Sequence, residues 1–160
     1  MGPIQSYNSN QSDFNSSRTE NMTEEMILSF SGLTDMPAGS PKSRSTQVCY
    51  LDFNQISRLP TKVVFDRDYP NLVELYLASN GLGTEIGLSY LPTRLEVLDL
   101  SANKLGKTGA GALKFLTELK QLRMLSLSSN ELTDEIFENF SEFENLSHMR
   151  LAGEAKLMKS

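Results

Sequence analysis

Gly106-Lys107-Thr108 has the residue types that end a phosphate-binding loop, in which glycine amides and a lysine hold phosphate oxygens at the start of a helix. That loop needs a further glycine five positions before Gly106, where this chain has Ser101. Glycine is required there because the backbone must approach the phosphates closely. We therefore expect no nucleotide site at this segment.

Nucleophilic and metal chemistry have few candidates. Cys49 is the single cysteine and His148 the single histidine, so the chain cannot supply a second imidazole for a metal site. Cys49 stands in an apolar stretch and is interpreted as a small buried hydrophobe. The acidic pair Asp134-Glu135 is placed where it complements the start of a helix. The sequence predicts no catalytic residues, no metal and no cofactor, and hence no enzyme.

The elements that position these residues are repeated units. Asn54, Asn80, Asn103 and Asn130 each follow a leucine by three residues and end the pattern Leu-x-x-Leu-x-Leu-x-x-Asn, with Cys49 in one leucine slot. Two degenerate copies flank these four, with Ser31 and Glu154 in the asparagine position. Residues two apart on a strand face the same side, so the leucines predict short strands with one buried face. The asparagines are predicted to satisfy buried backbone groups of the turns, which makes the six positions a structural ladder.

With this pattern the chain resembles the leucine-rich-repeat family. The resemblance implies an α/β fold: a right-handed solenoid, as a segment of a curved horseshoe, with a parallel concave sheet and a mixed helix and loop convex side. We expect a repeat domain over residues 23–157 and a short end at 158–160. The predicted repeats cover residues 23–45, 46–71, 72–94, 95–121, 122–145 and 146–157.

The convex segments are predicted to differ in kind. Apolar residues at helical spacing, among them Phe115, Leu116 and Leu119, predict an amphipathic helix over 107–120. A similar pattern predicts a helix over 134–143. Pro37 and Pro60 instead favour extended or turn-like backbone before any helix.

Composition adds limits on the partners. Residues 1–22 are rich in Asn, Ser and Gln and are predicted to be a disordered tail. The formal net charge is −5, and no basic stripe interrupts the acidic balance, so we expect no direct nucleic-acid binding. No apolar run is long enough to cross a bilayer, and no secretory signal is recognised, so we expect no membrane association. With a single cysteine, a cytoplasmic location is predicted, with a nuclear one as the variant.

The solvent side of the strands is the predicted functional surface. Tyr50 and Tyr76 fall on adjacent strands with acidic neighbours, and aromatic residues of this kind anchor protein interfaces. The alternative is that tyrosine is simply a good strand former on a solvated sheet. We expect a protein partner with a basic or amphipathic surface. The predicted protein-binding residues of the concave face are Val48, Tyr50, Asp52, Glu74, Tyr76, Val97, Asp99, Met124, Ser126, His148 and Arg150.

These expectations define a non-catalytic protein–protein interaction module that serves as a scaffold or adaptor. One alternative is a regulatory or targeting subunit of an enzyme complex, such as a phosphatase, a GTPase or a ubiquitin ligase, as similar repeat proteins often are. Another is a fragment of a receptor ectodomain. Few residues follow Leu151 to cover the last repeat, so further repeats or self-association at this end are also predicted.

Overall fold

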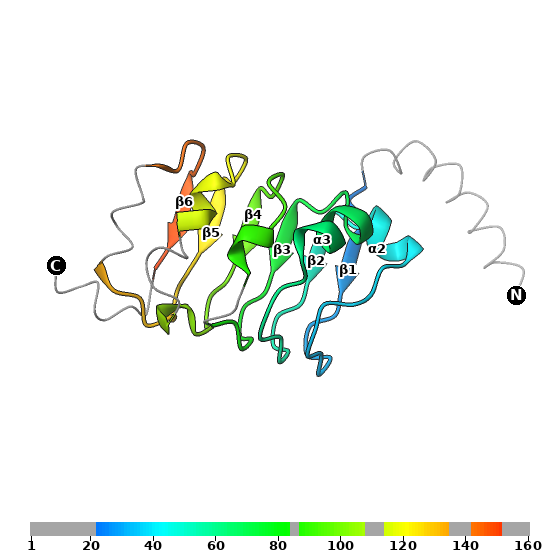
Figure 1. Cartoon of the computed structure of the whole chain (residues 1–160), viewed down its shortest axis with the longest axis horizontal. Coiled ribbons are helices and arrows are strands. Elements are labelled where there is room, and N and C mark those ends of the chain that lie inside the picture. The colour runs from blue at the N-terminus through cyan, green and yellow to red at the C-terminus, as the bar shows by residue number, and fades with distance from the viewer. Residues whose placement is uncertain (1–21, 84–86, 108–113, 135–141, 152–160) are drawn as a thin grey trace, which may run out of the picture.

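The computed structural model describes residues 22–83, 87–107, 114–134 and 142–151. Within these ranges six short strands form one open parallel sheet in which each strand pairs with the next along the chain. Figure 1 shows the strands side by side from one end of the molecule to the other. The strands are β1 (Glu25–Ile27), β2 (Val48–Tyr50), β3 (Glu74–Tyr76), β4 (Val97–Asp99), β5 (Met124–Ser126) and β6 (His148–Arg150). The predicted α/β solenoid fold is confirmed.

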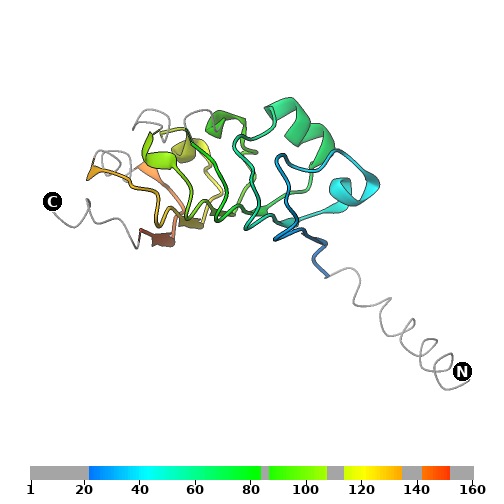
Figure 2. The ribbon, with the colours of Figure 1, turned by 90° about the horizontal axis from the view of Figure 1, so that it is seen from below.

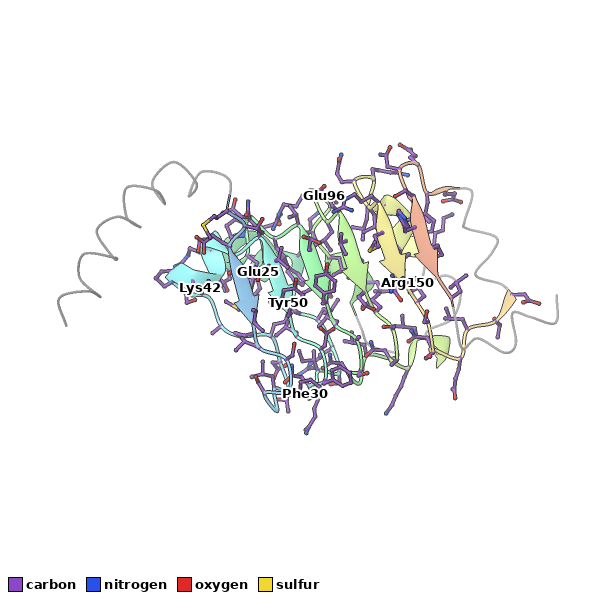
Figure 3. The ribbon with its side chains drawn as sticks, turned by 180° about the vertical axis from the view of Figure 1, so that it is seen from behind. Glu25, Phe30, Lys42, Tyr50, Glu96 and Arg150 are labelled. Carbon is purple, nitrogen blue, oxygen red and sulfur yellow. The ribbon has the colours of Figure 1, made fainter. Side chains whose placement is uncertain are left out.

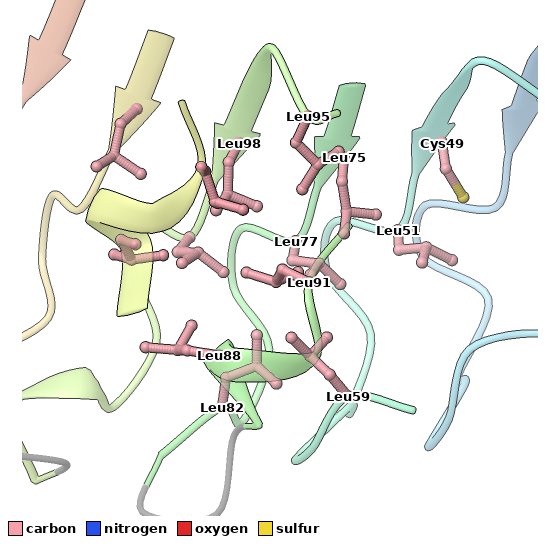
Figure 4. Close-up of a cluster of buried hydrophobic side chains, with 14 of the residues drawn as sticks. Cys49, Leu51, Leu59, Leu75, Leu77, Leu82, Leu88, Leu91, Leu95 and Leu98 are labelled. Atoms are coloured by element: carbon pink, nitrogen blue, oxygen red, sulfur yellow. The ribbon is translucent and has the colours of Figure 1, made fainter. Parts of the chain in front are cut away.

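The strands stand in the register that the leucine pattern predicts. Leu75 pairs with Leu98, and Leu98 with Leu125, so the middle residue of each strand points to the same interior. The next inward position is equally regular, because Leu77, Leu100 and Leu127 are no more than 1% exposed. Figure 4 shows leucines of successive repeats, among them Leu75, Leu77 and Leu98, gathered behind the sheet. Leucines from neighbouring repeats therefore form one continuous core, which supplies most of the stabilisation that single repeats lack.

Helical segments cover the opposite side of this core, as Figure 2 shows. Ser40 and Thr61 accept hydrogen bonds from backbone N–H groups in the first turns of α2 and α3, so each helix begins at a capped position a few residues after a proline. Later segments are tighter 3₁₀ turns. The segments are α2 (Pro41–Ser45), α3 (Lys62–Asp68), η2 (Leu88–Tyr90), η3 (Leu105–Lys107) and η4 (Lys114–Glu118).

The helix predicted over 107–120 requires a correction. Its described part from Lys114 to Glu118 is a 3₁₀ helix. Leu116 and Leu119 are buried as expected, whereas Phe115 is 42% exposed. In a 3₁₀ helix, residues three apart share a face, so Leu116 and Leu119 lie together on the buried face. Phe115 does not lie on that face. Residues 108–113, and 135–141 of the second predicted helix, lie outside the described residues.

The ladder asparagines join successive turns of the solenoid. Asn103 Nδ2 donates to the carbonyl oxygens of Leu77 and Leu100 at 3.0 and 2.9 Å, and its Oδ1 accepts from Leu82 N at 3.1 Å. Asn54, Asn80 and Asn130 make the same kinds of contact. One amide thus serves backbone groups of two neighbouring repeats, which buried polar groups require.

The two ends of the ladder differ from its centre. Ser31 is exposed, and its backbone N–H donates to Asn54 Oδ1 at 2.9 Å. The asparagine of the next repeat therefore satisfies the backbone of this turn. Glu154 lies outside the described residues, as do residues 1–21 of the predicted tail and the short end at 158–160. Leu146, Met149 and Leu151 are only partly buried against the core. The prediction of further repeats or self-association at this end stays a prediction.

Candidate functional site

The concave face is the side of the sheet that points away from the core, at the first and third residue of each strand and the second residue after it. Figure 3 looks onto this face and labels Glu25, Tyr50 and Arg150 on it. On β1 to β4 these positions hold four carboxylates and no cation: Glu25, Asp52, Glu74 and Asp99. The first cation on the face is Arg150, on β6. Over its first four strands the face is therefore acidic.

Two tyrosine rings lie at the centre of this acidic region. Tyr50 and Tyr76 are register partners on β2 and β3, and their rings stack with centroids 4.7 Å apart and planes 11° apart. The Tyr76 hydroxyl donates to Glu74 Oε1 at 2.9 Å. Both rings remain partly exposed. The stack is held by its own strands and presents ring surface to solvent, as interface anchors do.

Two aspartates beside the tyrosines are fixed by backbone hydrogen bonds. Asp52 Oδ1 accepts from Ala78 N at 2.9 Å, across to the next strand. Asp99 Oδ1 accepts from both Ser101 N, at 2.9 Å, and Ser101 Oγ, at 2.6 Å. Neither Asp52 nor Asp99 forms an ion pair with any of the described residues. Their positions are therefore set, while their charge has no cationic partner among the described residues.

Burial and this charge together raise the pKa values of two groups in the site. Burial raises the pKa of Asp52, the N–H of Ala78 opposes this change, and the charge of Asp99 raises the pKa further. The pKa of Tyr50 is raised by burial and then by Glu25, Glu74 and Asp52. All three carboxylates therefore act on one ring. A cation placed on this surface would relieve the repulsion among them.

A shallow hollow adjoins the stack on the side of the later strands. Its volume is about 220 Å³, and Tyr76, Asp99, Ser126 and Arg150 contribute to its wall, together with Val97, Leu98 and Met124. Asp99, Ser126 and Arg150 are register partners on successive strands. Since strands are spaced about 4.8 Å apart, the acidic and the basic residue stand roughly 10 Å apart across the hollow. The hollow has room for one side chain of a partner.

The predicted site residues divide by exposure. Val48 and Val97 are predicted on the exposed surface of the concave face, but each is only 2% exposed. They belong to the floor of the face. Ser126 is 9% exposed and also lies in this floor. The other predicted residues are partly or fully exposed: Tyr50, Asp52, Glu74, Tyr76, Asp99, Met124, His148 and Arg150.

The residues considered for chemistry have structural surroundings. Cys49 is fully buried, and burial followed by the charge of Asp52 raises the pKa of its thiol to about 12. Gly106 N donates to Asn130 O at 2.8 Å, and a Cβ at Gly106 would collide with Glu131 O. This glycine therefore permits close packing of two successive turns. No helix among the described residues is long and apolar enough to cross a membrane.

Two exposed aromatic residues were missed at the sequence level. Phe30 and Phe53 stack with centroids 4.4 Å apart and planes 5° apart, in the turns that follow β1 and β2. A signal was present, since each immediately precedes a ladder position, Ser31 or Asn54. The position lies outside the alternation of the strands, so the pattern of outward-facing strand residues does not include it.

Family models support the repeat reading of the sequence. Two models described as leucine-rich repeat match residues 93–114 and 121–143. The structure is similar to one described as "Structure of Shigella effector LRR domain", with a TM-score of 0.55 and 23% sequence identity over 85% of this chain and 52% of that one. This second likeness concerns the fold alone.

Similar sequences occur among known proteins. The chain is 40% identical to fibromodulin of Sus scrofa over 93 residues, which cover 58% of this chain and 60% of that protein. It is 35% identical to Protein toll of Drosophila melanogaster over 89 residues, which cover 56% of this chain and 8% of that protein. The chain thus spans less than two thirds of either relative.

Proposed function

Because the chain is a leucine-rich-repeat protein, we propose that it is a non-catalytic interaction module whose concave face binds a cationic segment of a partner protein. Leucine-rich-repeat domains in general are protein-interaction modules. The observation that carries the proposal is the stacked pair of Tyr50 and Tyr76 among carboxylates that form no ion pair with any described residue. Aromatic anchors surrounded by complementary charge are typical of protein interfaces.

The arrangement favours a lysine or an arginine of the partner. Asp52 and Asp99 are already held in place by backbone groups, so little conformational entropy is lost when a cation binds between them. The faces of the tyrosine rings attract the same cations. A phosphate-bearing ligand would meet the four carboxylates and be repelled. The proposal therefore excludes nucleic acid as the direct ligand of this face.

The role in the cell is part of the same proposal. A scaffold or adaptor needs only this surface, and a regulatory or targeting subunit of an enzyme complex would use it in the same way. The two roles differ in whether the captured partner carries a catalytic subunit. The proposed location is the cytoplasm, in keeping with a single cysteine that is buried.

The test compares the wild type with two double variants in affinity capture from a cell lysate. Tyr50→Ser/Tyr76→Ser removes the stack. Val63→Ser/Phe115→Ser removes side chains from the convex side that are 70% and 42% exposed, and serves as the matched control. We expect a partner that the wild type and the control retain, that the tyrosine variant loses, and that elutes as salt is raised.

Equal capture by all three proteins would reject the tyrosine stack as the binding site. Loss only in the control variant would move the site to the convex side. Circular dichroism and thermal unfolding of each variant confirm that the fold persists, so a lost partner reports on the surface.

A further inference from the structure

Phe30 and Phe53 expose an aromatic surface that packing does not account for. Phe30 is 74% and Phe53 50% exposed, although their rings lie flat against each other. Figure 3 shows Phe30 beyond the ends of the strands, on the same side of the molecule as Tyr50. Phe30 and Phe53 belong to a row of equivalent turn positions, one in each successive repeat. The next two positions in this row hold small residues, Ser79 and Ala102, so the turn itself does not require an aromatic ring.

The backbone at both phenylalanines is unfavourable for such residues. Phe30 has φ of 56° and Phe53 has φ of 59°, in the left-handed region that bulky L-residues rarely adopt. The described repeats turn this way before their ladder positions, as Ser79, Ala102 and Ser129 also show. Glycine and asparagine adopt that conformation at lower cost. An exposed, strained aromatic pair points to a role in recognition.

The phenylalanine pair continues the proposed binding face. Tyr50 and Phe53 are three residues apart, which corresponds to about 10 Å along an extended chain. Asp52 lies between them in sequence, with its carboxylate bonded to Ala78 N. Ile27, the register partner of Tyr50, is 67% exposed beside them. Two aromatic stacks thus flank one carboxylate on the first three strands.

We infer that the pair formed by Phe30 and Phe53 is a second anchor, which stacks the guanidinium of an arginine in the partner's basic segment. This inference rests on the proposed function, since the first anchor is the tyrosine stack. The outer ring faces attract cations, and the planar guanidinium can lie parallel to them, which a lysine ammonium cannot do. The neighbouring carboxylate, Asp52, favours the same charge and disfavours the phosphates of a nucleic acid.

The spacing of the anchors specifies the partner segment further. Two sites about 10 Å apart match side chains three residues apart on a peptide in the polyproline II conformation, where three residues make one turn with a rise of about 3.1 Å per residue, so these side chains share one face. The probe is a set of capped peptides in a Gly-Ser background that carry two arginines at separations of one to six residues, with lysine pairs as a second set. We expect the tightest binding at a separation of three, and arginine to be preferred over lysine.

The variant for the test is Phe30→Asn/Phe53→Asn, because asparagine tolerates left-handed backbone. We expect it to bind the arginine peptide about threefold to tenfold more weakly and to lose the preference for arginine over lysine. Its melting temperature should stay within a few degrees of the wild type, since relief of backbone strain offsets loss of the stack. Ser79→Asn/Ala102→Asn is the control in the same row and should bind as the wild type does.

The outcomes separate the two proposals. Unchanged peptide affinity in the phenylalanine variant, with loss in Tyr50→Ser/Tyr76→Ser, overturns the second anchor and leaves the tyrosine site standing. Loss in the phenylalanine variant alone supports the anchor and removes the tyrosine stack from the account. A fall of ten degrees or more in the melting temperature of the phenylalanine variant assigns the pair to stability and overturns the inference. An uncharged peptide or an oligonucleotide that binds as well as the arginine peptides also overturns it. So does a wild-type protein that binds none of the arginine peptides at millimolar concentration.

Discussion

Replacing Asn103 with alanine tests how the repeats are joined. Its amide nitrogen donates to the carbonyl oxygens of Leu77 and Leu100, and its oxygen accepts from Leu82 N. The two carbonyls also accept from the neighbouring asparagines, Asn80 and Asn130, so each keeps a partner in the variant. The N–H of Leu82, which is fully buried, would be left without its acceptor.

The expected loss follows from this difference. A buried N–H without a partner costs about 1–3 kcal/mol, and weakening two shared hydrogen bonds adds about 0.5–1 kcal/mol each. The free energy of unfolding should therefore fall by about 2–5 kcal/mol. The measurement is equilibrium unfolding in urea, with Asn145→Ala as control. Asn145 is exposed and donates to Lys120 O, so Asn145→Ala should lower the free energy of unfolding by only about 0.5 kcal/mol.

Amide hydrogen exchange identifies the site of the loss. Since repeat proteins can open locally, exchange of single amides is more informative than one global transition. The N–H of Leu82 should lose more protection in the Asn103 variant than neighbouring strand amides do. A loss of stability below about 1 kcal/mol, or unchanged protection at Leu82, would refute the view that the ladder amide satisfies this buried group.

Three further outcomes are expected. Asp52→Asn keeps the acceptor for its backbone partner but removes a carboxyl group whose pKa is raised in the folded state. Because the folded protein holds that proton more tightly than the unfolded chain does, wild-type stability falls as pH rises above the ordinary carboxyl range. The gain in stability of the variant, measured by thermal unfolding, should therefore be largest at neutral pH and vanish in acid. The thiol of Cys49, with a pKa of about 12, should resist a maleimide at neutral pH in the native protein and react in urea; equal native labelling would contradict its burial. Gly106→Ala should lower the unfolding free energy by about 1–3 kcal/mol because its Cβ meets Glu131 O, whereas Gly83→Ala, with 3.5 Å to its nearest atom, should cost less than half of that.

The sheet could be predicted because its signal repeats. Each leucine occupies the same slot in successive copies, so the register of Leu75, Leu98 and Leu125 follows once the copies are aligned on their asparagines. Burial on one face leaves no other register, since a slip of one residue would expose every leucine.

Other features depend on distances that a periodic pattern does not contain. Val48 and Val97 alternate like surface residues, yet both are buried. Phe115 fits a helical period, but the segment forms a tighter turn. The phenylalanine stack joins two residues in turns, where the left-handed backbone of Phe30 and Phe53 directs the rings outward together. None of these follows from the alternation of apolar and polar residues alone.

Chemical-shift mapping shows whether the concave face binds a basic segment, with the isotope-labelled chain titrated with the peptide that carries two arginines three residues apart. We expect shifts that saturate and that cluster at Tyr50, Asp52, Tyr76 and Asp99, while amides of α3 on the convex side stay unchanged. Shifts confined to the convex side, or the same shifts with a peptide that carries two glutamates, would contradict this expectation.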